Sequence, residues 1–540
     1  MQLTTVLRST ATLEVVSEPP AQTPTLRAAR TRWSILRWTA TLLALSLTVL
    51  LVHGYHPLAE DGGLYAAGVE LTLNRSLFPH FTEFVTEHLS FSIFAPVVAT
   101  LTRTTHLSLL AVLFILNLLS IALTLTAARA VLRRVTPNER AQLAGVAAFA
   151  VFWTVPIAGT SLLLMDPYVT ARSLMMPLSL WAVAFALDDW RDNPRPLIGC
   201  ILSIALSAAF HPLMAGYALG LIIVLRALRS ASRVQLLTTL ALFTFIAAAV
   251  LQLRAHAESA AVVLAARSRY YWFLSQWHWY ELIGLIGPLL VLLALRRLNR
   301  SSLGERGASL ALAAILYGCF ATAIALIFAQ EHYFAHTVAR LQPLRAFLTI
   351  YLIMFLLLGA SAQQIFERAS GRSSAWRYAR YAILPILLVT AFAMFVAQRS
   401  DFPASAHIEL PWRSQQSTNP WVRAFLWCRD NTPPDALFAL DAHYITTPGE
   451  DAQTFRAIAQ RSVLPDFSKD GGEAAITPRL ASEWAAGYAA QLNLDQQTTS
   501  QLREDLAPFG VDWLILRVDS PAALDCPYNN NLFKVCKLRP

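Results

Sequence analysis

The sequence predicts an α-helical polytopic membrane protein with a small α/β domain at its C-terminal end. Three observations carry this prediction. Hydrophobic residues make up 55% of the 540 residues and charged residues only 14%, whereas a soluble protein carries about 25% charged residues. The apolar residues are grouped in blocks of about 20, the length that crosses a bilayer core. From about residue 400 onward the composition becomes polar and mixed.

About 11 transmembrane helices are expected between residues 33 and 397. The apolar blocks lie near 33–53, 107–131, 142–164, 172–188, 196–211, 213–228, 234–252, 281–298, 308–329, 345–366 and 379–397. The first two blocks are separated by a long first outer loop, residues 54–106. Its stretch "FSIFAPVVATL" is too short to cross the membrane, so we expect a helix on the membrane surface or dipping into it.

The basic residues set the predicted orientation. If the surface helix does not cross, the basic clusters after residues 131, 188, 228, 297 and 366 all face the cytoplasm, as the positive-inside rule requires. Residues 1–32 then form a disordered cytoplasmic tail, and residues 398–540 lie on the extracytoplasmic side. Because topology accounts for the formal charge of +9, binding to nucleic acid, which needs one contiguous basic face, is not expected.

The C-terminal residues 398–540 are predicted to fold as an α/β domain. "NPWVRAFLWCRDN" and "EWAAGYAAQLN" have helical patterns, while "VDWLILRVD" and "LFKVCKL" are strand-like. Cys526 and Cys536 bracket a turn, and outside the cytoplasm they are candidates for a disulfide. The domain shows no Gly-rich phosphate loop, nucleophile elbow or metal-ligand spacing. Chemistry is therefore expected in the outer loops of the membrane domain.

An acidic pair, Glu60 and Asp61, follows the first apolar block in "HPLAEDGG". A carboxylate beside the bilayer can act as a general base toward an acceptor hydroxyl or as a ligand of a divalent cation such as Mg²⁺ or Mn²⁺, with Asp166 as a second carboxylate. The Gly62-Gly63 pair would let the backbone approach a ligand. The alternatives are ordinary turns, at the end of a span for the acidic pair and at the end of a helix for Asp166.

A second candidate stretch is "EHYFAHTVARLQPLR", residues 331–345. On a helix, His332, His336 and Arg340 share one face. Because arginine is well suited to holding phosphate, we expect phosphate binding here. The alternative is an interfacial helix with snorkelling side chains. The remaining candidates are Arg172 and Arg345 for the phosphate, and His56 and His211 for the substrate.

The "AEDGG" motif and the architecture together resemble the GT-C superfamily of membrane glycosyltransferases. This superfamily includes protein O-mannosyltransferases, oligosaccharyltransferase catalytic subunits and lipid A aminoarabinose transferases. The shared features are the first span, the long first outer loop with its acidic pair, the surface helices and the C-terminal outer domain. The acidic pair is Glu-Asp where several members have two Asp, and no "WWD" signature is present, which argues against the oligosaccharyltransferase branch.

The resemblance implies an inverting transfer of a sugar from a polyprenyl-phosphate donor to a glycan, lipid or protein acceptor. The reaction would take place at the outer face of a bacterial inner membrane. Asp61 matches the catalytic carboxylate, with Glu60 as its neighbour and Asp166 as the second acidic position. Arg340 or Arg345 matches the position that binds the donor phosphate.

Two other functions stay open on the sequence. A transporter or flippase of a lipid-linked or anionic solute would use the outer carboxylates and histidines to relay protons. Alternating access, however, would place ionisable residues in the middle of the spans, and few lie there. A non-catalytic scaffold for envelope assembly would use residues 400–540 as a binding module.

Overall fold

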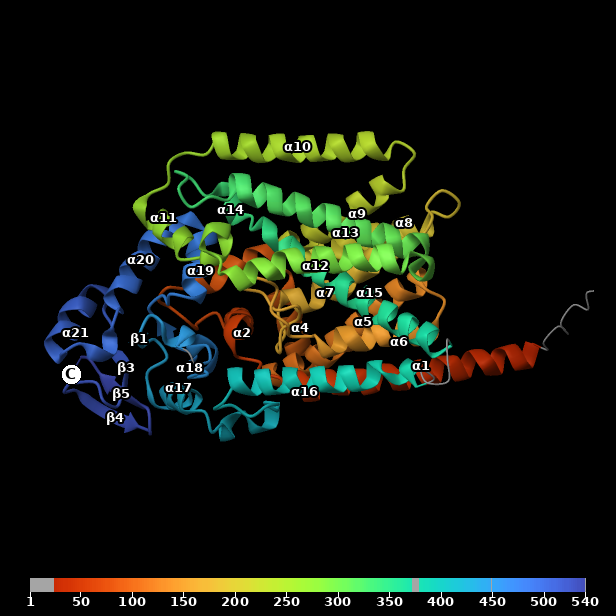
Figure 1. Cartoon of the computed structure of the whole chain (residues 1–540). Helices are drawn as coiled ribbons and strands as arrows, with labels where there is room; N and C mark the ends of the chain where they lie inside the picture. The colour runs from red at the N-terminus through yellow and green to blue at the C-terminus, as the bar shows by residue number, and fades with distance from the viewer. Residues whose placement is uncertain (1–23, 372–377, 448, 540) are drawn as a thin grey trace, which may run out of the picture. The chain divides into compact units, whose positions relative to one another are not determined.

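The computed structural model describes residues 24–371, 378–447 and 449–539 (Figure 1). Most of the predicted disordered tail lies outside the described residues. Its last part, residues 24–32, was expected to be disordered but forms the first turns of helix α1 (Pro24–His53). The chain divides into two units between Ala44 and Leu45. The second unit contains the remaining helices and the sheet.

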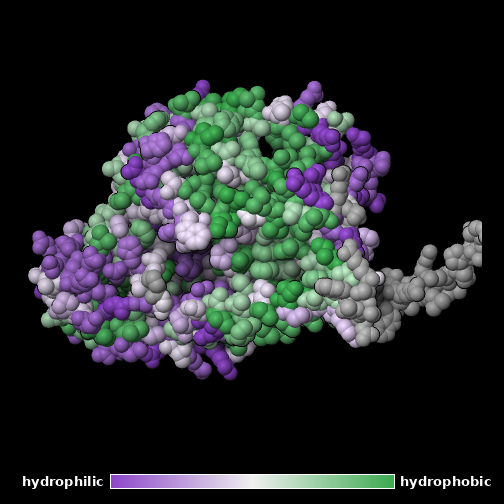
Figure 2. All heavy atoms as spheres, viewed as in Figure 1, coloured by the Kyte–Doolittle hydropathy of each residue, from purple (hydrophilic) through white to green (hydrophobic). Residues whose placement is uncertain are grey.

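Apolar helices of 16 to 29 residues form most of the second unit before residue 402. They are α5 (Leu109–Val135), α7 (Ala171–Ala186), α8 (Arg195–Phe210), α9 (Pro212–Leu228), α10 (Arg233–Leu253), α12 (Trp279–Leu298), α13 (Arg300–Phe328), α15 (Phe347–Ser370) and α16 (Ile383–Asp401). Shorter helices between them are α2 (Glu60–Leu73), α3 (Glu83–Thr86), α4 (Phe94–Thr105), α6 (Glu139–Val151), α11 (Ala260–Arg267) and α14 (Thr337–Arg340). Figure 2 shows hydrophobic residues gathered over the helical part and hydrophilic ones over the C-terminal part.

Within the described residues, six helices are long and apolar enough to cross a membrane. A seventh span results if the helical segment Glu83–Phe91 and α4, which meet at a bend of 97°, cross together. The expected number of about 11 is therefore not confirmed. The predictions nevertheless matched many helices, since α8, α9, α10 and α12 each begin and end within two residues of a predicted block.

The predicted span 142–164 is wrong as a continuous helix. Helix α6 ends at Val151, and the chain then runs through turns, with an isolated bridge between Pro156 and Leu163. Proline removes a backbone donor and breaks a helix, so Pro156 stops a stretch whose composition alone resembles a span. The irregular chain that follows, residues 152–170, carries Asp166.

The chain after α16 folds into a mixed five-stranded sheet with the order β2-β1-β3-β5-β4. The strands are β1 (Leu437–Ala439), β2 (Ser462–Val463), β3 (Trp513–Arg517), β4 (Asp525–Asn529) and β5 (Phe533–Lys537). Strand β1 pairs in parallel with β2 and β3, and β5 pairs antiparallel with β3 and β4. The helices are α17 (Pro420–Asn431), α18 (Phe455–Ala459), α19 (Lys469–Ile476), α20 (Ala481–Ala490) and α21 (Thr499–Leu506).

The strand and helix predictions for this part are confirmed. "VDWLILRVD" contains β3, "LFKVCKL" contains β5, and the two helical patterns become α17 and α20. A disulfide joins Cys526 on β4 to Cys536 on β5. Buried apolar side chains such as Phe425, Phe438 and Val535 form the core between α17 and the sheet.

The C-terminal part packs on the first loop of the helical part. The Thr454 amide donates to the Leu58 carbonyl oxygen (3.1 Å), and the Gln460 amide side chain donates to Glu70 (3.0 Å). Arg479 forms ion pairs with Glu83 and Glu87. These contacts bring α19 next to α2, where the acidic pair lies.

Candidate functional site

A cavity of about 1440 Å³ lies between the loops of the helical part and the C-terminal part. Charged side chains from segments far apart in the sequence line it: Glu60, Asp61, Asp166, Arg172, Arg269, Glu281, Arg340, Arg345, Asp401, Asp451, Lys469 and Glu473. His211 also lines the cavity, whereas the other histidines proposed from the sequence, His56, His332 and His336, are not part of its lining. The cavity thus brings together most of the candidates.

The acidic pair forms the first two residues of helix α2, and both carboxylates contact Lys469. Asp61 Oδ1 lies 2.9 Å from Lys469 Nζ, and Glu60 forms a second ion pair with the same ammonium. The lysine side chain is 12% exposed, and the Asp61 side chain is 44% exposed. Burial alone would raise the pKa of Asp61, but Lys469, assisted by Arg172 and Arg345, holds this pKa at about 2. Asp61 is therefore ionised at neutral pH.

The two glycines of "AEDGG" allow close packing within the protein. A Cβ atom on Gly63 would lie 2.3 Å from the Thr454 side chain, and one on Gly62 would lie 2.6 Å from the Pro57 carbonyl oxygen. The carbonyl oxygen of Glu60 also accepts a hydrogen bond from Thr454 (3.1 Å). The motif is therefore the point where the C-terminal part meets α2, and its glycines bring the backbone close to protein atoms.

Asp166 and Arg172 form a buried ion pair that lines the same cavity. Arg172 Nε donates to Asp166 Oδ2 (3.1 Å), and Nη2 donates to the other oxygen. Thr170 caps helix α7 by accepting from the Arg172 amide, which fixes the arginine in the first turn. Burial raises the pKa of Asp166 although Arg172 opposes this effect.

Several nitrogen atoms of residues that line this cavity lack a hydrogen-bond partner within the protein. They are Arg172 Nη1, Arg345 Nε and His211 Nδ1, all buried. The Arg345 guanidinium also lies 5.7 Å from the centre of the Tyr271 ring, a favourable position for a cation. A buried donor without a partner is costly, and all three residues line the cavity, where Arg172 and Arg345 contribute positive charge.

The predicted row of His332, His336 and Arg340 on one helical face is wrong. Helix α14 covers only Thr337–Arg340, and His332 is exposed in the turn before it. The His336 ring and the Arg340 guanidinium both bind the carboxylate of Glu258, at 2.7 and 2.8 Å. This partner comes from a distant loop, so the tertiary contact determines the conformation here.

Arg340 and His56 hold the C-terminal part in place. Arg340 Nε donates to the carbonyl oxygen of Ala475 (2.8 Å), near the end of α19. His56 is fully buried, lies 2.8 Å from Glu409 and stacks on Phe402. Arg172 and Arg345 are therefore the predicted phosphate-binding residues whose donors lack partners within the protein.

The sequence-based reasoning missed what the C-terminal part contributes. Lys469 and Glu473 lie one turn apart on α19 and line the cavity. Arg269, from the loop after α11, donates to the carbonyl oxygens of Phe467 and Ser468 and fixes the start of this helix. The sequence does distinguish Lys469 in one respect. It is one of only three lysines among the 43 basic residues.

The raised pKa of Glu473 predicts that the stability of the protein depends on pH. It is 9% exposed and 3.9 Å from His88, and burial, with smaller contributions from Asp470 and Asp61, raises its pKa to about 8. An unfolded glutamate has a pKa of about 4.3. The folded state therefore binds the proton more tightly, so this contribution to stability is present below about pH 4.3 and is lost as the pH rises through 8.

We expect Glu473→Gln to remove this loss. Thermal unfolding of the purified full chain should show similar stability for variant and wild type at pH 5. At pH 9 the variant should be more stable by on the order of 5 kcal/mol. The exposed Glu504 provides the control, Glu504→Gln. The same pH profile in wild type and Glu473→Gln would contradict the assignment.

The predicted divalent cation does not fit these side chains as they are arranged. Asp61 and Asp166, its expected ligands, are each bound to a basic group, Lys469 and Arg172. In the part of the chain that the structure describes, no group of three or more His, Cys, Asp or Glu side chains could hold a metal ion.

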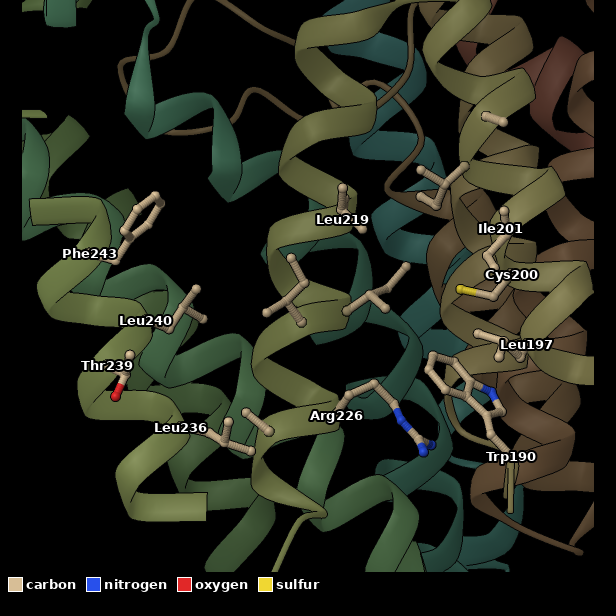
Figure 3. A pocket seen from close by; sticks show the side chains of 15 residues that line it. Trp190, Leu197, Cys200, Ile201, Leu219, Arg226, Leu236, Thr239, Leu240 and Phe243 are labelled. Carbon is tan, nitrogen blue, oxygen red and sulfur yellow. The ribbon is translucent and has the colours of Figure 1, made fainter. Parts of the chain in front are cut away.

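An apolar cavity of about 860 Å³ lies among α8, α9 and α10 (Figure 3). Arg226, the charged residue in its described lining, stacks over Trp190 at 3.8 Å and donates to the carbonyl oxygen of Asp188 (2.9 Å). No carboxylate is among the described residues that line it. The polar cavity is therefore the candidate active site.

Comparison with solved structures decides the fold. The structure is similar to the archaeal oligosaccharyltransferase AglB from Archaeoglobus fulgidus, which was solved in complex with an inhibitory peptide and a dolichol-phosphate. The match has a TM-score of 0.50 at 12% identity and covers 90% of this chain and 70% of that one. The chain has the GT-C fold. At this identity the likeness establishes the GT-C fold alone.

A second solved structure is also similar, and one segment of the chain matches a family model. The arabinofuranosyltransferase AftD from Mycobacteria is also similar, with 15% identity, a TM-score of 0.43 and coverage of 90% of this chain and 35% of that one. Residues 419–486 match the family described as "Domain of unknown function (DUF6798)". The comparison with curated proteins gives no match. The matched segment contains α19, so it supplies Lys469 and Glu473 to the cavity.

Proposed function

We propose that this GT-C protein is a glycosyltransferase that moves a sugar from a polyprenyl-phosphate donor to an acceptor hydroxyl on a glycan, lipid or protein. One observation carries the proposal. Asp61, whose carboxylate is ionised, lines the same cavity as Arg172 and Arg345, and each of these two arginines keeps a buried nitrogen without a partner within the protein. Transfer from a lipid phosphate needs a carboxylate for the acceptor and cations for the phosphate.

In the proposed reaction the acceptor oxygen attacks the anomeric carbon of the sugar. Asp61 orients the hydroxyl and accepts its proton as the new bond forms. The bond to the donor phosphate breaks, and its electron pair leaves with the phosphate. Arg345 and the free Nη1 of Arg172 stabilise the departing anion. A single displacement of this kind inverts the anomeric centre.

The distribution of arginines supports a cavity at the outer face. At the end of α7 opposite Arg172, the carboxylate of Asp188 pairs with Arg134 (2.8 Å) and Arg306 (3.6 Å). The positive-inside rule favours the cytoplasm for this basic end. The cavity and the C-terminal part would then be periplasmic in a bacterial inner membrane, with the N-terminus cytoplasmic.

The test is sugar transfer by the full chain in lipid vesicles that contain a pool of labelled polyprenyl-phosphate sugars. We expect labelled product above the level of protein-free vesicles. Absence of transfer from every donor, together with uptake of the lipid or of an anionic solute, would instead indicate a transporter.

Arg345→Gln is expected to weaken binding of the donor. A hydrogen bond to a charged group contributes about 1.5–3 kcal/mol, so the KM for the donor should rise roughly 10- to 100-fold. Arg413→Gln is the matched control, because Arg413 is exposed and does not line the cavity. An unchanged KM in Arg345→Gln would reject the phosphate-binding role.

A further inference from the structure

We infer that Lys469, contributed by the segment that matches the family of unknown function, is the built-in cation of this site and takes the place of a divalent metal ion between Glu60 and Asp61. The part of the inference that concerns catalysis by this site rests on the proposed function. The charge arrangement itself can be tested without turnover.

The geometry fits a fixed cation. The ammonium contacts both carboxylates of the acidic pair, and its side chain is 12% exposed while each carboxylate is nearly half exposed. Burial lowers the pKa of Lys469, but the two carboxylates outweigh burial and raise this pKa above its ordinary value. The lysine is therefore charged at neutral pH.

A metal ion would have to compete with this ammonium. The oxygens that a divalent cation would need are those that Lys469 contacts, and the other predicted ligand, Asp166, accepts from Nε and Nη2 of Arg172. Bringing a second cation beside Lys469 places like charges together in a partly buried site, which is unfavourable. Binding of a metal ion therefore requires that the lysine leaves.

The surrounding structure keeps the lysine in place. Arg269 Nη1 donates to the carbonyl oxygen of Ser468 (2.7 Å) directly before α19, and the Lys469 amide donates to Asp466 Oδ1 (2.6 Å). The next residue, Asp470, forms a fully buried ion pair with Arg456 (2.7 Å). Lys469 is thus held by contacts from the helical part and from within its own segment.

The inference assigns a role to the segment 419–486. Its helix α19 completes the charge balance of a site whose acidic residues lie in the first loop. We therefore expect sugar transfer to proceed in the presence of a metal chelator. The acidic pair should become a metal site only when the lysine is removed.

Binding of Mn²⁺ to the purified full chain, followed by electron paramagnetic resonance, tests this directly. The wild type should show no Mn²⁺ binding that depends on Asp61. Lys469→Met should gain a Mn²⁺ site, and the double variant Lys469→Met/Asp61→Asn should lose it again. Lys469→Arg keeps the charge and should gain none. Lys537→Met is the matched control, because Lys537 is exposed on β5 and outside the cavity.

Transfer in vesicles gives the second readout. Wild-type transfer should be unchanged by EDTA, and Lys469→Met should lower it at least tenfold. Mn²⁺ binding by the wild type that Asp61→Asn abolishes would overturn the inference, as would wild-type transfer that stops with EDTA. If no donor supports transfer, the proposed function fails, but the Mn²⁺ experiment still decides whether Lys469 is the built-in cation.

Discussion

Asp61→Asn is expected to abolish sugar transfer while the protein stays folded. Asparagine has nearly the same size and still accepts a hydrogen bond from Lys469, and Glu60 retains its ion pair with that lysine. What is lost is the negative charge that orients the acceptor and takes its proton. General-base catalysis contributes about 10²- to 10⁴-fold, so we expect kcat to fall by at least this amount.

The measurement compares initial rates of transfer in vesicles, with thermal unfolding of each purified variant as the folding control. Asp435→Asn makes the same chemical change at an exposed position that does not line the cavity, and it should leave the rate unchanged. An Asp61→Asn variant with the turnover of the wild type would reject the catalytic role of the acidic pair.

Arg172→Met is expected to cause the largest loss of stability. The Asp166 and Arg172 side chains are only 2% and 9% exposed, so the substitution leaves a buried carboxylate without its counter-charge. Removing one partner of a buried ion pair typically costs about 3–5 kcal/mol. The free energy of unfolding of the purified protein in detergent should fall by an amount of this order.

The double variant Arg172→Met/Asp166→Asn separates charge from packing. Because asparagine carries no charge, most of the lost stability should return, which a double-mutant cycle would record as a large coupling energy. Equal stability of the single and double variants would show that the two side chains do not act as a buried ion pair.

The sequence predicted the bounds of several apolar helices well where composition and length agree. The helices α9, α10 and α12 begin and end close to the predicted blocks. The block at 142–164 failed because its apolar composition conceals Pro156, which ends regular structure after α6. The average composition of an apolar block does not register a single proline, so the block was predicted as one continuous helix.

The candidate site was predicted in part. The local sequence indicated Glu60 and Asp61 as candidate site residues, and both line the large polar cavity. Their partner Lys469 lies far along the chain, and no local pattern connects the two. The contact of Gly63 with Thr454 is equally distant in sequence, which is why the glycines were assigned to a ligand.

The same reason explains the error at His336 and Arg340. Their spacing fits one face of a helix, but Glu258 binds both side chains, and this tertiary contact outweighs the local pattern. The sequence around residue 336 gives no indication of a carboxylate on another loop.

The most direct test of the central claim is a structure of the full chain in lipid nanodiscs that contain a polyprenyl phosphate. The phosphate should lie in the polar cavity that Asp61 lines, within hydrogen-bond distance of Arg345 and Arg172. A phosphate bound elsewhere, for example beside Arg226 in the apolar cavity of Figure 3, would contradict the proposed site.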